Sequence, residues 1–394
     1  MSARVDTYQS QWIENPSEFG MLSEAWDAAL RRSGDDNPFL LSEFVLTWWK
    51  YFGNGLRLRI LVIRNGDTIV GGLPLLCDQG GLLTFPGGIA ANYTEWLAMQ
   101  DQHRLWPILL EALAERTDWQ RLRLPRYRAS RLTTDRDVLR QAARERGLLC
   151  DVLETDQTYL IMLSDGSRGC FQRLPRKLRT SLRRSERELA RFGPISLRSS
   201  DRWETVRDWF SLYCQFSVRA FQQRKQESAF EDDHYRMFVR DFLEQACRNH
   251  YIDANVLTVG ERIIAMHFGY AIRDHLNYVF TTFDSEFARW GPGHLLIYRL
   301  VQLAEQRRNP LIDLFTGEQL YKRQWSNRKE PVLCVELWRD TLRGRIAWCV
   351  HGLGAARVVR EARQTIRRSP SLLRWARRAR RVAQRVAHSM RSAN

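Results

Sequence analysis

The sequence predicts a mixed α/β protein built from two tandem copies of one unit, each with a mostly antiparallel central sheet flanked by helices. Two observations lead to this prediction. A β-hairpin pattern occurs once in each half of the chain, and each hairpin is followed by a helix of amphipathic spacing and a further apolar strand. Repetition of this kind constrains the architecture more strongly than any single element does.

Short glycine-containing links mark the two hairpins. The first link contains Asn65-Gly66-Asp67 and the second is Gly260-Glu261. Such links between β-type runs favour tight turns. A third strand is predicted at His275–Phe283, with its first-half counterpart beginning at Leu82–Phe85. The joined runs are Leu56–Val62 with Thr68–Leu76, and Ala254–Val259 with Arg262–Ile272.

In each half, a helix and another strand follow the predicted hairpin and third strand. Both helices place apolar residues at three–four spacing, and the triplet Leu-Ala-Glu begins at Leu113 in one and at Leu303 in the other. The alternative is that this order is common in α+β proteins and that the triplets match by chance. The predicted pairs are helix Leu105–Thr117 with strand Arg121–Pro125, and helix His294–Arg307 with strand Leu311–Phe315.

Three further helices are predicted between the two sheets, at Phe171–Phe192, Trp203–Arg219 and Asp232–Arg248. The domain division that follows is residues 1–150 for the first half, 151–340 for the second half and 341–394 for an Arg-rich helical tail.

Composition indicates a globular protein. The 394 residues are 44% hydrophobic and 27% charged, and no stretch approaches the roughly 18 apolar residues of a membrane span. The first 16 residues lack the pattern of a secretion signal. Seven scattered cysteines without a Cys-x-x-Cys pair argue for free thiols, against a disulfide scaffold or a zinc site, and for the cytoplasm.

The net charge of +16 is informative mainly through its location. Five of the 61 basic residues are lysines, a skew typical of a GC-rich genome. The excess gathers at Arg168–Arg191 and in the C-terminal tail. Basic surfaces attract nucleic acid, anionic lipid and anionic cofactors alike, so the charge alone does not select a partner.

Three segments of the second half carry a family resemblance. They are Leu174–Arg184, Tyr278–Leu295 (YVFTTFDSEFARWGPGHL) and Leu311–Trp325 (LIDLFTGEQLYKRQW). Together they resemble the GNAT-type acetyltransferase domain of the CelD-like family, which is associated with bacterial exopolysaccharide and cellulose production. Asn37–Trp49 and Leu58–Leu76 resemble the amino-terminal region of that family.

The resemblance implies two tandem GNAT-like units and an acyl-CoA-dependent N-acyltransferase, with acetyl-CoA or another acyl-CoA as co-substrate and no metal. The acceptor would be an amine of a sugar or a small metabolite. Two alternatives stay open: a Fem-type transferase that uses aminoacyl-tRNA, and a non-catalytic GNAT-fold adaptor. Nucleic acid is expected as a partner only if the chain is a Fem-type transferase. The oligomeric state is not predicted.

The loop before the predicted helix at His294 is the best candidate for the cofactor site. The free N–H groups and dipole of a helix N-terminus suit a pyrophosphate. Gly291 and Gly293 permit close approach of the backbone, Pro292 can stiffen the turn, and Arg289 can pair with phosphate oxygens. The alternative is a simple Gly-Pro-Gly turn. The first half has no such sequence in its equivalent loop, 101–104, and we expect no cofactor site there.

The resemblance places the pantetheine arm along the preceding strand, which makes Tyr278, Phe280, Thr281 and His294 cofactor-binding candidates. Direct transfer from a thioester to an amine needs a proton acceptor and a donor for the leaving thiolate. The candidates are Asp284 and Asp313 for deprotonation, Tyr321 for protonating the thiolate and Lys322 for stabilising negative charge.

Each candidate has a structural alternative. Asp284 could cap the following loop, Asp313 could be a buried hydrogen-bonding residue, and Tyr321 and Lys322 could anchor a surface loop. His267 lies in an apolar run and is interpreted as a core or cleft histidine. In the tail, Leu372, Trp375, Ala379, Val382 and Val386 fall at helical spacing among arginines. This basic amphipathic helix could contact the inner membrane peripherally, dock on a partner, pack on its own domain or remain disordered.

Overall fold

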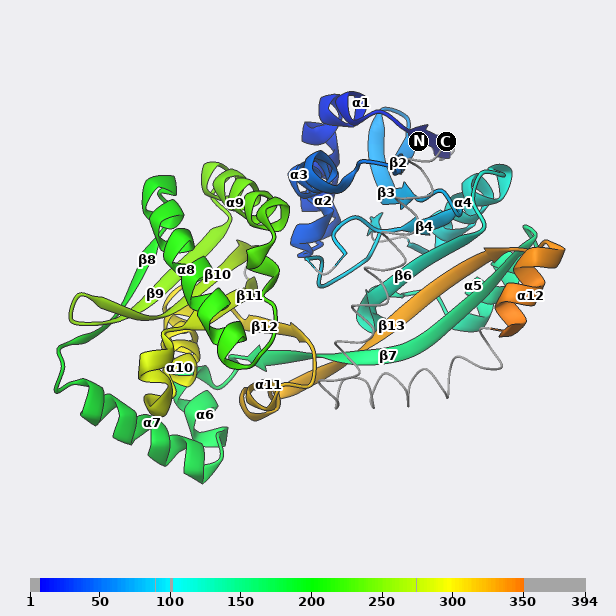
Figure 1. Ribbon diagram of the computed structural model, residues 1–394. Coiled ribbons are helices and arrows are strands. Elements are labelled where there is room, and N and C mark those ends of the chain that lie inside the picture. The colour runs from blue at the N-terminus through cyan, green and yellow to red at the C-terminus, as the bar shows by residue number, and fades with distance from the viewer. Residues whose placement is uncertain (1–7, 89, 100–101, 274, 351–394) are drawn as a thin grey trace, which may run out of the picture. The chain divides into compact units, whose positions relative to one another are not determined.

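The computed structural model describes residues 8–88, 90–99, 102–273 and 275–350 (Figure 1). The predicted tail helix, with Leu372 to Val386, lies outside these residues. The chain divides into two compact units, Met1–Leu337 and Trp338–Asn394. In the second unit the described helix is α12 (Leu342–Val350). None of the described helices has the length and apolar character needed to cross a membrane.

The first unit contains a mixed sheet of 13 strands in its described residues, with the path β1-β2-β3-β4-β6-β13-β7-β12-β11-β10-β9-β8, and β5 paired to β3. The first half comprises β1 (Tyr8–Ile13), α1 (Pro16–Met21), α2 (Ser23–Ser33), η1 (Pro38–Leu40), α3 (Ser42–Phe52), β2 (Arg57–Asn65), β3 (Thr68–Cys77), β4 (Leu82–Thr84), β5 (Leu97–Ala98), α4 (Gln102–Glu115), β6 (Arg121–Arg128), η2 (Ala129–Arg131), α5 (Arg136–Arg144) and β7 (Leu148–Met162).

The second half comprises α6 (Gly166–Arg173), α7 (Arg176–Leu189), β8 (Ile195–Ser200), α8 (Trp203–Gln223), η3 (Ala229–Glu231), α9 (Asp233–Arg248), β9 (Ile252–Val259), β10 (Arg262–Ile272), β11 (His275–Phe283), η4 (Ser285–Trp290), α10 (Pro292–Gln306), β12 (Leu311–Thr316), α11 (Leu320–Trp325) and β13 (Arg328–Arg339). The expected mixed α/β architecture is confirmed.

The predicted internal repeat is visible in the strand pairing. Strands β1, β2, β3 and β4 pair antiparallel in order, and β4 then pairs parallel with β6 after the helix α4. Strands β8, β9, β10 and β11 do the same, and β11 pairs parallel with β12 after α10. The two halves therefore repeat one topology.

Both predicted hairpin turns are confirmed. Asn65 pairs with Thr68 and Val259 pairs with Arg262, so each loop has two residues. Gly66 and Gly260 each have φ of 58°, the left-handed conformation that a tight hairpin turn requires and that glycine adopts without a steric cost.

The halves exchange a strand, which the sequence did not predict. Strand β7 follows β6 in the chain but pairs antiparallel with β12 of the second half. Strand β13 follows β12 but lies between β6 and β7 in the sheet order. Each half thus supplies a strand beside the parallel pair of the other. The proposed boundary at residue 150 lies within β7.

The single helix predicted at 171–192 is wrong, because the structure contains two helices there. α6 ends at Arg173 and α7 begins at Arg176, with Pro175 as its N-cap residue. Proline disfavours helical conformation in the residue before it, here Leu174, which has φ −60° and ψ 147°.

Helices cover the two faces of the second-half sheet (Figure 1). Helices α8 and α9 bury Phe210 and Phe242 in a core that continues into the first half, where Phe44 of α3 lies 5.1 Å from the Phe242 ring centroid. Helix α10 buries Leu296 and Leu300 on the other face in a second core, together with leucines of α7. The strand β11 therefore lies between two packed layers.

Candidate functional site

The candidate site begins where β11 and β12 separate. Their parallel pairing covers His275–Asn277 against Leu311–Asp313. Beyond it the register of β12 shifts between Asp313 and Thr316, and Phe315 has φ of 58°. An irregularity of this kind bends a strand and ends its pairing. The edge of β11 from Tyr278 onward is left without β12 as a partner.

A cleft of about 700 Å³ lies along this part of β11, and its described lining includes Gln319 and Tyr321, which follow β12, but no residue of β12 itself. One wall is the strand β11, and one end is the first turn of α10. The opposite wall is formed by α8 and the segment that follows it. Arg224 is the one charged side chain among the described lining residues, apart from the titratable His294. The lining includes Tyr213, Ser217, Phe221, Arg224, Ser228, Phe230, Tyr278, Thr281, Thr282, Phe283, Gly291, Gly293, His294, Gln319 and Tyr321.

The turn into α10 has the geometry of an anion site. Gly291 is the N-cap residue with φ of 59°, and Pro292 is the first helical residue. The first turn of a helix leaves backbone N–H groups without helical acceptors. A Cβ added at Gly293 would meet the Phe283 ring at 3.8 Å, which is an ordinary contact. Packing within the chain therefore does not demand glycine at 293, and the space above it is available to a ligand.

His294 presents a neutral N–H donor at this end of the cleft. The Trp325 indole N–H donates to Nδ1 of His294 at 3.0 Å. Because an indole nitrogen is a donor only, Nδ1 must be the unprotonated nitrogen, and the proton of the neutral ring is on Nε2. Burial lowers the pKa of His294, which keeps the ring neutral.

Two tyrosines of the cleft remain protonated at neutral pH. Burial raises the pKa of Tyr321 to about 12, and burial also raises the pKa of Tyr278. The two ring centroids lie 6.3 Å apart. The Tyr278 ring also stacks on His267 at 5.0 Å, and His267 is fully buried, as a core histidine would be. Tyr321 therefore carries its hydroxyl proton at neutral pH.

Asp313 and Lys322 lie outside the described cleft lining and hold the irregular end of β12. Oδ1 of Asp313 accepts from the Phe315 N–H at 2.7 Å. Nζ of Lys322 donates to the carbonyl oxygens of Thr316 at 2.6 Å and Phe315 at 3.4 Å. Burial lowers the pKa of Lys322 to about 8. Both side chains thereby stabilise the bend that separates β12 from β11.

Asp313 also connects the two halves. The Tyr93 hydroxyl donates to Oδ2 at 2.6 Å and the Thr158 hydroxyl donates to Oδ1 at 3.1 Å. Burial raises the pKa of Asp313 to about 6, although the Tyr93 hydrogen bond opposes the rise. Sequence reasoning missed Tyr93 and Thr158, because nothing in the local pattern of either residue indicates a partner so distant in the chain.

Asp284, Arg289 and Phe280 are also outside the described lining. Asp284 is buried, caps η4 by accepting from the Glu286 N–H, and accepts from Arg262 at 2.7 Å. Arg289 is exposed, with its guanidinium 3.8 Å from the centroid of the Trp290 ring. Phe280 packs against aromatic rings on the α8 side of β11. The structure thus brings together Tyr278, Thr281, Gly291, Gly293, His294 and Tyr321 of the predicted residues.

The wall contributed by α8 was also missed. Tyr213, Ser217 and Phe221 line the cleft at four-residue spacing along one helix face. That spacing is visible in the sequence, but it is equally typical of a helix that faces a core. Among the described residues, no group of three or more His, Cys, Asp or Glu side chains could hold a metal ion.

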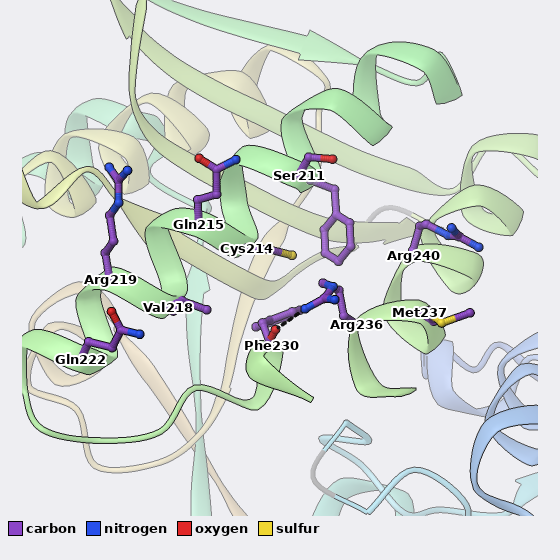
Figure 2. A pocket seen from close by; sticks show the side chains of 11 residues that line it. Ser211, Cys214, Gln215, Val218, Arg219, Gln222, Phe230, Arg236, Met237 and Arg240 are labelled. Atoms are coloured by element: carbon purple, nitrogen blue, oxygen red, sulfur yellow. Dashed lines mark hydrogen bonds between the residues drawn. The ribbon is translucent and has the colours of Figure 1, made fainter. Parts of the chain in front are cut away.

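A second hollow of about 610 Å³ lies between α8 and α9 (Figure 2). Phe230 lines both this hollow and the cleft. Arg219 projects from α8, and Arg236 and Arg240 project from α9. Arg236 donates to the Phe230 carbonyl oxygen at 3.1 Å, so it fixes the segment that separates the two spaces.

Comparison with known families identifies the domain that holds the cleft. Residues 176–323 match the model described as the acetyltransferase (GNAT) domain. The chain carries a GNAT-type acetyltransferase domain. The match includes α8, β11, the first turn of α10 and Tyr321, and so covers the walls of the cleft. The CelD-like branch remains a resemblance of the sequence. No curated protein sequence matches the chain.

Solved structures share the fold over most of the chain. FemX matches 87% of this chain and 99% of its own, with a TM-score of 0.60 and 10% identity. The C-terminal domain of a predicted lysylphosphatidylglycerol synthetase from Agrobacterium fabrum also matches 87% of this chain and 99% of its own, with a TM-score of 0.53 and 13% identity. L-PGS from Bacillus licheniformis matches 84% of this chain and 95% of its own, with a TM-score of 0.50 and 12% identity. At these identities the likeness concerns the fold alone, including the GNAT domain and the half before it.

Proposed function

We propose that the GNAT domain is an acyl-CoA-dependent N-acyltransferase that transfers an acyl group, most simply acetyl, to an amine. The observation that carries the proposal is the cleft between β11 and α8, which ends on the Gly291-Pro292-Gly293 turn of α10. An extended arm can bond to the free edge of β11, while a diphosphate lies at the helix N-terminus. The family match supports the same donor.

The lining residues support direct transfer. The amine nitrogen attacks the thioester carbonyl carbon, a C–N bond forms, and the C–S bond breaks. The hydroxyl of Tyr321 gives its proton to the departing sulfur and is reprotonated from solvent. Neither Asp nor Glu is among the described lining residues, so the proton lost by the amine passes to water. His294 offers its Nε2–H to a negative oxygen, and no acyl-enzyme is involved.

Asp313 and Lys322 act in this proposal as positioning residues, because they hold the bend of β12 that opens the cleft. Asp284 and Arg262 hold the start of the η4 turn that leads to Gly291. Arg289, exposed beside that turn, remains available to phosphate oxygens. The acceptor class, an amine of a sugar or small metabolite, and any place in exopolysaccharide or cellulose production rest on the resemblance of the sequence.

Binding of acetyl-CoA tests the proposal. We expect acetyl-CoA to raise the melting temperature, since a ligand at 100 times its Kd stabilises the folded state by about 2.7 kcal/mol. Gly293→Glu places a carboxylate where the diphosphate would lie and should abolish the shift. Gly20→Glu is the matched control, because a Cβ at the exposed Gly20 meets nothing within 4 Å. Absence of any shift with acyl-CoAs would contradict the proposal.

The alternative donor is an aminoacyl-tRNA, which the net charge of +16 would suit. It predicts salt-sensitive binding of tRNA and no thermal shift with CoA. The adaptor hypothesis predicts a closed strand separation with Asp284, Asp313 and Tyr321 all turned away from it. Asp284 and Asp313 do lie outside the described lining. The open cleft and the presence of Tyr321 in its lining favour the catalytic hypothesis instead.

A further inference from the structure

Helix α7 presents a row of basic side chains on its exposed face. Its inward face is apolar, with Leu178, Leu182 and Leu189 buried in the core beside α10. Figure 1 shows α7 next to α6 and α10. We call the outward row the basic stripe, and it consists of the exposed residues Arg176, Lys177, Thr180, Ser181, Arg184 and Arg187 of α7 together with Arg191 in the turn after the helix. The helical part of the stripe, from Arg176 to Arg187, spans about 17 Å at 1.5 Å per residue.

The charge of this region is poorly compensated by its own acidic residues. Residues 166–191 contain nine Arg and Lys and two acidic residues, Glu186 and Glu188. Both acids are engaged by the neighbouring elements of the domain. Glu186 accepts from Arg299 at 2.9 Å, and Glu188 accepts from the Trp290 indole at 2.9 Å. Glu188 is also 3.4 Å from Arg184, but this pair is exposed and worth little.

The stripe contains a shallow groove of about 340 Å³. Its lining combines the cations of Arg176, Lys177 and Arg184 with the hydroxyl groups of Thr180 and Ser181. Guanidinium, ammonium and hydroxyl donors around one hollow are complementary to the oxygens of a phosphodiester. The groove thus fits the headgroup of an anionic phospholipid or one phosphate of a nucleic acid backbone.

An exposed aromatic residue beyond the end of the stripe favours the lipid. Phe192 is 61% exposed, and its ring lies 5.5 Å from that of Trp290. Duplex nucleic acid is bound through its phosphates by cations and polar groups, and such contact gives an exposed phenyl ring no apolar surroundings. At a membrane surface, cations meet the anionic headgroups while an aromatic residue enters the boundary with the acyl chains.

We propose that the basic stripe docks this protein on an anionic membrane surface, with phosphodiester headgroups at the groove and Phe192 in the interface. The proposal is independent of the acyl donor. Because Trp290 contacts both Glu188 and Phe192 and directly precedes Gly291, docking places the glycine turn of the cleft beside the membrane. A substrate carried by a lipid would then meet the cleft without leaving the surface.

Sedimentation with vesicles of phosphatidylglycerol and phosphatidylcholine tests the charge requirement in the full chain. A cation near an anionic surface contributes about 1 kcal/mol, roughly fivefold in partitioning. The triple variant Arg176→Gln, Lys177→Gln, Arg187→Gln should therefore bind about 100-fold more weakly than the unaltered protein. The matched control removes the exposed Arg32, Arg202 and Arg219 in the same way, has the same net charge and should bind like the unaltered protein.

A site-specific probe separates the stripe from the Arg-rich tail. Among the described cysteines six are buried and Cys349 is exposed. In a Cys349→Ser background, Phe192→Cys labelled with an environment-sensitive fluorophore should shift its emission to the blue with phosphatidylglycerol vesicles. It should not respond to phosphatidylcholine alone. Met21→Cys, at a residue 80% exposed in the first half, is the control that should not shift.

Three outcomes would overturn the proposal. The first is equal vesicle binding by the stripe variant and its control. The second is an unchanged emission at position 192 while the protein is bound to vesicles, which would assign that binding to another surface. The third is a stripe variant that loses affinity for duplex RNA but keeps its affinity for vesicles, which would assign the stripe to nucleic acid.

Discussion

The two halves of the first unit differ in what fills the space beside their parallel strand pair. In the second half, β11 continues past its pairing with β12 into the cleft. In the first half, β6 continues past its pairing with β4, which ends at Thr84 and Arg123, but its own chain fills the space. The Thr94 N–H donates to the Arg126 carbonyl at 2.8 Å, and the Arg126 N–H donates to Oγ1 of Thr94 at 2.9 Å.

The filling segment is held by a dense set of contacts. Tyr93, Glu95 and Trp96 are each 1% exposed. The Arg128 N–H donates to Glu95 at 3.0 Å, and Trp96 lies 4.7 Å from Trp106 of α4. Unpaired strand edges need partners for their backbone groups. The same topology therefore gives a scaffold in the half where the chain fills the space beside the parallel strand pair, and a binding cleft in the half where that space is left to a ligand.

The largest expected effect comes from removing a buried side chain from the segment that fills the space in the first half. Trp96→Ala removes a buried indole and should lower the free energy of unfolding by about 3–5 kcal/mol. Chemical denaturation measures this, with Trp96→Phe as the control that retains a ring. A loss below about 1 kcal/mol would mean that the segment does not fill the space as described.

The reciprocal change places a large side chain in the cleft of the second half. Thr282→Trp adds an indole inside the cleft, where there is room, so we expect stability within about 1 kcal/mol of the unaltered protein. The same indole should block the donor, remove the thermal shift with acetyl-CoA and lower transfer by at least about 100-fold, which corresponds to about 2.7 kcal/mol. Thr282→Ser should retain both properties. Retained transfer in the tryptophan variant would show that the cleft is not the donor site.

A smaller effect is expected at the hydrogen bond that joins Tyr93 of the first half to Asp313 of the second half. Tyr93→Phe removes the hydroxyl that donates to Asp313 and leaves a buried carboxylate with one donor fewer. Loss of a partner by a buried acceptor costs about 1–3 kcal/mol. Denaturation of Tyr93→Phe beside Tyr127→Phe, whose hydroxyl has a long bond of 3.4 Å to the Arg131 carbonyl, provides the comparison. Equal losses would argue against a special link between Tyr93 and Asp313.

The pH dependence of stability reports the same carboxyl group. The pKa of Asp313 is raised in the folded state, from 3.8 to about 6, so the folded protein binds the proton more tightly than the unfolded chain does. This contribution to stability is present below pH 3.8 and is lost as the pH rises from about 4 to 6, with a slope of at most about 1.4 kcal/mol per pH unit. Asp313→Asn should remove this slope, which denaturation curves between pH 4 and 7 would detect.

The features that the sequence predicted are local ones. Gly66 and Gly260 mark hairpins because a left-handed turn residue is required there, and the Gly291-Pro292-Gly293 turn marks the start of α10. The cofactor candidates Gly293 and His294 and the proton donor candidate Tyr321 lie together at the cleft. These residues were accessible to prediction because the signal and the structure occupy the same few positions.

The features that the sequence did not predict depend on distant pairing. An apolar run identifies a strand but not its neighbour, so the exchange of β7 and β13 left no local signal. The contact of Tyr93 with Asp313 joins residues 220 positions apart. The α8 wall is hidden for another reason, since Tyr213 and Phe221 on a helix face look the same whether they face a cleft or a core.

The strand exchange also affects how the protein can be made. The first half is synthesised up to β6 long before β13, the strand placed beside β6, leaves the ribosome. The roughly 200 intervening residues take about 10–40 s to translate at typical rates. During that interval the nascent first half has an open sheet edge, and edges of this kind recruit other strands. The sheet of the first half is therefore completed only after β13 has been translated, and a fragment that stops after the first half would be prone to aggregate.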